Sequence, residues 1–71
     1  MEPHIKIVVD KLSKKLKGLP LYIGAADNVI HIYYTKRRRA IFSEVLDEID
    51  KTHKYEGYLV YRKYVGKTKL C

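Results

Sequence analysis

Four consecutive cations, Lys36 to Arg39, are the residues of this sequence best suited to binding an anion. Behind them, apolar residues recur at the spacing of one helix face: Ile41, Phe42, Val45, Leu46 and Ile49. We therefore expect a helix over residues 36–53, capped by Thr35, with the four cations in its first turn.

Cations in a first turn oppose the positive end of the helix dipole, at a cost of about 0.3–1 kcal/mol each when exposed. The acids of this helix come later in the sequence: Glu44, Asp47, Glu48 and Asp50. No acid stands three or four residues after Arg38 or Arg39, so the next turn offers them no ion pair. Free N–H groups beside several cations bind phosphate well, although solvated surface charges are the ordinary alternative. The pattern predicts a phosphate site made of Lys36, Arg37, Arg38 and Arg39.

Tyrosine is the second unusual feature, with seven tyrosines against one phenylalanine and no tryptophan. Six of them fall on expected strands, where side chains alternate between the two faces of a sheet. If the apolar residues of these strands, Leu59 and Val65 among them, face the helices, the other face receives an aromatic and basic set. That set is Tyr22, His31, Tyr33, Tyr58, Arg62 and Tyr64.

Nucleic-acid bases stack on exposed aromatic rings for about 1–3 kcal/mol each. The candidate nucleic-acid-binding residues on this face are therefore Tyr22, Tyr33, Tyr58, Arg62 and Tyr64. Two other interpretations remain open, because tyrosines also stabilise sheets through cross-strand pairs and are enriched at protein interfaces.

No catalytic or metal-binding arrangement is apparent in the sequence. The three histidines and Cys71 are too far apart to match a zinc-binding spacing. The four glycines are isolated, so no glycine-rich phosphate loop exists, and neither Ser13 nor Ser43 sits in a nucleophile motif. We therefore expect a binding protein and no enzyme, with no metal and no cofactor.

Size and charge agree with a small binding protein. The chain has 71 residues, room for one domain spanning residues 1–71, and a formal net charge of +7 that attracts anionic partners. Its single cysteine, Cys71, cannot form a disulfide within the chain, which favours a reducing, cytoplasmic location. No apolar run approaches the roughly 20 residues that a membrane span requires.

The remaining elements follow from periodicity and from glycine and proline. We expect a helix over residues 3–17, two strands over 19–24 and 29–35 joined by a turn at 25–28, and a last strand over 58–65 followed by a basic tail, 66–71. The predicted fold is α+β, in the order α-β-β-α-β, with two helices on one face of a small, mainly antiparallel sheet of three or four strands. Because residues 4–9 also alternate, a β-α-β-β-α-β, ferredoxin-like order is the alternative.

Both element orders occur in families that bind RNA, but this sequence carries neither family's signature. The alternative order is that of RNA-recognition motifs, whose glycine–aromatic signature is missing from the last strand. The preferred order occurs in some K-homology domains, whose Gly-X-X-Gly loop is also missing, so we assign no family. We predict a protein that binds DNA or RNA with weak sequence preference. The second interpretation is a small protein-interaction or regulatory module, as viruses and plasmids encode, including one that forms a homodimer.

Overall fold

The computed structural model describes residues 3–66, and begins with helix α1, Pro3–Lys15. Its apolar stripe is buried at Ile5, Val8 and Leu12, whereas Ile7 points into solvent. The helix expected here is confirmed, and the alternative of a strand at residues 4–9 is wrong. Helical spacing buries four apolar side chains: Ile5, Val8, Leu12 and, just past the end of the helix, Leu16. Their burial stabilises the fold by more than the exposure of Ile7 costs.

A hairpin follows, made of β1, Leu21–Ala26, and β2, Val29–Tyr34, paired in antiparallel fashion. The turn is tighter than the four residues expected, because only Asp27 and Asn28 lie between the strands. Both have positive φ angles, 52° and 60°, which is the geometry that matches the twist of a two-residue hairpin.

The second helix starts later than the sequence pattern indicated. Residues 38–40 form a short 3₁₀ turn, η1, Arg38–Ala40, and helix α2 covers Glu44–Thr52. Ser43, not Thr35, is the N-cap: its backbone is extended, and its hydroxyl accepts a hydrogen bond from the Leu46 N–H at 3.2 Å. The prediction that the four cations occupy the first turn of this helix is therefore wrong.

Helix polarity explains the later start. With Ser43 as the cap, Glu44 and Asp47 occupy the first turn and Lys51 the last, so the helix charges now agree with the dipole. The predicted apolar stripe of this helix also included Phe42 wrongly, because its side chain is 88% exposed.

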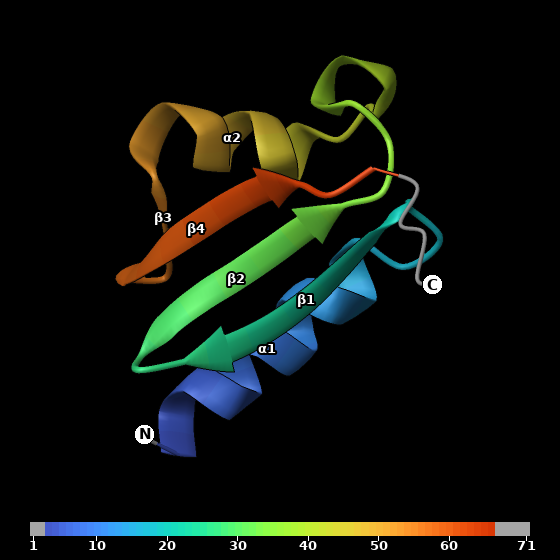
Figure 1. Cartoon of the computed structure of the whole chain (residues 1–71). Coiled ribbons are helices and arrows are strands. Elements are labelled where there is room, and N and C mark those ends of the chain that lie inside the picture. The colour runs from blue at the N-terminus through green and yellow to red at the C-terminus, as the bar shows by residue number, and fades with distance from the viewer. Residues whose placement is uncertain (1–2, 67–71) are drawn as a thin grey trace, which may run out of the picture.

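The chain then makes a short strand β3, Lys54–Tyr55, and a long strand β4, Tyr58–Tyr64. The sheet order is β1-β2-β4-β3, with β2 and β4 parallel and the two outer pairs antiparallel (Figure 1). The α+β fold in the order α-β-β-α-β is confirmed, with β3 as the fourth strand. The predicted basic tail lies outside the described residues, apart from Gly66.

One core holds the fold together. Its buried members are Ile5, Val8, Leu12, Leu16, Ile30, Ile32, Tyr34, Ile41, Leu46, Ile49 and Val60. Residues 30, 32 and 34 alternate along β2, and Val60 is the register partner of Ile30, so all four sheet residues lie on one face. Both helices therefore pack on that face, and α1 passes behind β1 in Figure 1. Neither described helix is long and apolar enough to cross a membrane.

Candidate nucleic-acid interface

The faces of β4 are reversed relative to the sequence prediction. Val60 is only 6% exposed and belongs to the core, whereas Leu59 is 55% exposed on the opposite face. Tyr58, Arg62 and Tyr64 share the face of Val60 and so lie on the helix side. Placing these three on the open face was wrong. The strand carries apolar residues at adjacent positions, and a shift of one residue moves every side chain to the other face.

The open face of the sheet, the one without helices, carries two rows of residues in register across three strands. The row nearer the carboxyl ends of β2 and β4 consists of Tyr22, Tyr33 and Lys63. The next row consists of Gly24, His31 and Tyr61. Tyr22 and Tyr33 thus lie on the face assigned to them, and Tyr61 and Lys63 take the places given to Tyr58, Arg62 and Tyr64. The sequence could have indicated Tyr61 only if the core residue of β4 had been known.

Aromatic contacts hold this open face together. The rings of His31 and Tyr33 are nearly parallel, at an interplanar angle of 14° and a centroid distance of 6.1 Å. The Tyr33 hydroxyl lies 3.4 Å from His31 Nδ1, and the Tyr61 ring is 5.4 Å from that of His31. Tyr22 and Tyr61 are the most accessible rings of the face, at 67% and 48% exposure.

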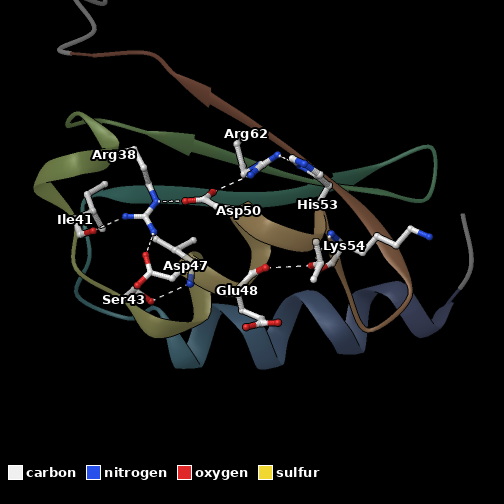
Figure 2. A network of polar contacts seen from close by, with 11 residues as sticks. Arg38, Ile41, Ser43, Asp47, Glu48, Asp50, His53, Lys54 and Arg62 are labelled. Carbon is white, nitrogen blue, oxygen red and sulfur yellow. Dashed lines mark hydrogen bonds and ion pairs between the residues drawn. The ribbon is translucent and has the colours of Figure 1, made fainter.

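Arg38 is not available to a ligand, because internal acids neutralise it. Its Nε donates to Asp50 at 2.9 Å and its Nη2 to Asp47 at 2.7 Å (Figure 2). A third bond runs from Nη1 to the carbonyl oxygen of Ile41. The guanidinium is thus fixed between η1 and α2, and we withdraw Arg38 from the phosphate site.

Arg62 is held in the same network, shown in Figure 2. Its Nη1 donates to the second oxygen of Asp50 at 2.8 Å, and its Nη2 lies 2.6 Å from His53 Nδ1. Asp50 therefore bridges the two guanidinium groups, and the network of two arginines and two aspartates carries no net charge. Arg62 ties β4 to α2 and offers nothing to the open face.

The Tyr34 hydroxyl lies beside this network, without a hydrogen-bond partner of normal geometry among the described residues. Burial raises the pKa of Tyr34 above its ordinary value, and the charge of Asp50 raises it further. Arg38 and Arg62 act in the opposite direction but do not cancel the effect of burial.

The other three cations of the basic run converge on one hollow. Lys36, Arg37 and Arg39 line a depression of about 360 Å³ together with Thr35, Ala40 and Tyr64. No carboxylate of residues 3–66 lies within ion-pair distance of these three side chains. The Arg37 guanidinium carbon is 5.4 Å from the centroid of the Tyr64 ring, a cation–π distance. Tyr64 thus takes part from the helix side, at the strand end.

This basic hollow, defined by Lys36, Arg37, Arg39 and Tyr64, lies beyond the carboxyl ends of the parallel strands β2 and β4. Backbone connectivity puts it there: the chain leaves β2 at Tyr34 and enters the basic run at once. Of the four cations that the sequence indicated, three line the hollow, and the sequence assigned them to the wrong element. Ser43 followed by Glu44 was the signal that would have placed the start of the helix correctly.

Among residues 3–66, no group of three or more histidine, cysteine, aspartate or glutamate side chains is placed to hold a metal ion. Comparison of the chain with known proteins finds no matching protein family, no similar curated protein and no similar solved structure.

Proposed function

We propose that this protein binds nucleic acid and holds the phosphate backbone at the basic hollow. The observation that carries the proposal is the division of the basic run by the fold. Arg38 is neutralised by Asp47 and Asp50, while Lys36, Arg37 and Arg39 converge without an acid of the described chain in ion-pair range.

Three cations at one hollow repel one another, and this repulsion is relieved when an anion binds between them. Guanidinium groups present parallel N–H donors that match two phosphate oxygens, and an ammonium adds a point charge. The ring of Tyr64 restrains Arg37, so less side-chain entropy is lost on binding. The formal net charge of +7 adds long-range attraction for a polyanion.

A polyanion fits better than an anionic membrane surface. An interfacial helix needs an apolar face free to enter the lipid, but the apolar stripes of α1 and α2 are buried in the core. Beside the basic hollow, the open face offers aromatic rings, which suit bases better than lipid headgroups.

The test compares two variants that remove the same charge. Lys36→Ala/Arg37→Ala/Arg39→Ala deletes the hollow, and Lys6→Ala/Lys11→Ala/Lys51→Ala deletes three exposed helix cations that make no ion pair with the described residues. Binding to labelled DNA and RNA is measured by fluorescence anisotropy at several salt concentrations, and circular dichroism verifies the fold.

We expect the first variant to lose at least tenfold in affinity and the second to lose much less. In the wild type, log affinity should fall against log salt with a slope of about −2 to −3 for three phosphate contacts, and the first variant should flatten this slope. Equal losses in both variants would mean that net charge alone attracts nucleic acid and that the hollow is no site. If the wild type binds no nucleic acid, the proposal is wrong.

A further inference from the structure

We infer that the nucleic acid bound here is single-stranded, with its bases stacked on the open face of the sheet. This inference rests on the proposed function and adds the substrate class and the residues that select it. Tyr22, His31, Tyr33 and Tyr61 would form the stacking surface, with Lys63 as a cation beside it.

The two accessible rings stand at different places on this surface, as stacking of successive bases requires. Tyr22 lies on the outer strand β1 in the row that contains Tyr33, and Tyr61 lies on β4 in the row that contains His31. Rows on one face are two residues apart, about 6.7 Å along the strands. His31 contacts both Tyr33 and Tyr61, so the rings in the middle support those at the margins.

The stacking surface and the basic hollow meet at the same end of the sheet, although Tyr64 lines the hollow from the helix side. The first row is one residue before the ends of β2 and β4, where Tyr34 and Tyr64 stand, and Tyr64 lines the hollow. A single-stranded nucleic acid whose phosphate is held by Lys36, Arg37 and Arg39 can therefore pass over this end of the sheet and place its adjacent bases over Tyr33. Lys63, on the open face next to Tyr33, is positioned for the next phosphate.

A duplex does not fit this surface. In a double helix the base faces cover one another, and only the base edges reach the grooves, so flat rings on a sheet find no face to stack on. The major groove, about 12 Å wide, admits a helix or a two-stranded ribbon, but three long strands carrying tyrosines are wider than a ribbon. An unpaired strand offers one π-face per base without a cost for unpairing.

Charge also decides against a second copy of the chain on this face. Each copy carries a formal net charge of +7, and Lys63 stands within the surface that would have to be buried, so two copies repel. The same charges favour a phosphate backbone. A homodimer is therefore an outcome that the test must detect, and sedimentation of the free protein detects it.

The experiment compares single-stranded and duplex oligonucleotides of equal length, as DNA and as RNA, by fluorescence anisotropy. Tyr22→Leu and Tyr61→Leu keep an apolar side chain but remove the flat ring, whereas Tyr61→Phe keeps the ring. Both sites are exposed, so the fold should persist, and thermal unfolding verifies it.

We expect the wild type to bind single strands more tightly than duplex. Each leucine variant should lose about tenfold in affinity for single strands and less than twofold for duplex. A loss of this size is what removal of one ring that stacks a base produces. Tyr61→Phe should bind like the wild type. The inference fails if the leucine variants weaken both substrates equally, if phenylalanine is no better than leucine, or if the protein is a dimer that buries this face.

The two proposals fail differently. If replacing Lys36, Arg37 and Arg39 abolishes binding while the tyrosine variants have no effect, the basic hollow stands and stacking is wrong. If no oligonucleotide binds the wild type, the proposed function itself is wrong.

Discussion

Replacing Asp50 with asparagine tests whether the neutralised arginines are structural and not part of the binding site. Asp50 uses both carboxylate oxygens, at 2.9 Å from Arg38 Nε and 2.8 Å from Arg62 Nη1. Asparagine keeps the shape of the side chain but removes the charge and turns one acceptor into a donor that faces a guanidinium. Two cations that are mostly shielded from water then lose their shared partner.

The magnitude lies between two known limits. Exposed ion pairs contribute about 0.2–1 kcal/mol, whereas loss of one partner from a fully buried pair costs about 3–5 kcal/mol. Asp50 is 37% exposed, so solvent screens part of the effect, but it serves two partners. We expect Asp50→Asn to lower the free energy of unfolding by about 2–3 kcal/mol. For a domain of 71 residues, this lowers the melting temperature by about 10–20 °C.

The assay is urea denaturation followed by circular dichroism, with Asp47→Asn as the matched control. Among residues 3–66, Asp47 forms an ion pair with Arg38 alone, and it is more exposed than Asp50, so its loss should cost less than about 1 kcal/mol. Affinity for nucleic acid should change less than twofold in Asp50→Asn at a temperature where the variant is folded. The reasoning is refuted if Asp50→Asn costs no more than Asp47→Asn, or if it strengthens binding by releasing Arg38 to the ligand.

Three further predictions concern Tyr34, Ser43 and Gly57. The raised pKa of Tyr34 means that the unfolded chain ionises first as pH rises, so its contribution to stability is complete below about pH 10 and is lost above it. Tyr34→Phe should reduce this alkaline loss, measured by denaturation at pH 8 and pH 11, and should change stability at pH 8 by less than about 1 kcal/mol. Ser43→Ala should destabilise by about 1 kcal/mol through loss of the N-cap, whereas Ser13→Ala, at an exposed helix site, should cost less than about 0.5 kcal/mol, as urea denaturation will measure. Gly57 has a φ of 87° in the turn before β4, so Gly57→Ala should lower the melting temperature even though the added methyl group meets no atom.

Local pattern was sufficient for most of the elements. The spacing of Ile5, Val8 and Leu12 predicted α1, because helical period and burial coincide there. The turn residues between β1 and β2 predicted the hairpin for a local reason as well, since only a few residue types adopt two successive positive φ angles without strain. The composition also predicts an anionic partner, and this stays a prediction.

Tertiary structure decided which face of the sheet each side chain of β4 occupies and which residues distant in the sequence come into contact. Strand β4 carries apolar residues on both faces, so only its parallel pairing with β2, which sets Val60 opposite Ile30, determines that Tyr61 and Lys63 face outward. In the same way, four adjacent cations look alike in sequence. The fold brings Asp47 and Asp50 to Arg38 from 9 and 12 residues further along the chain and leaves Lys36, Arg37 and Arg39 at the strand ends. An ion pair depends on distance in space and not on distance along the chain.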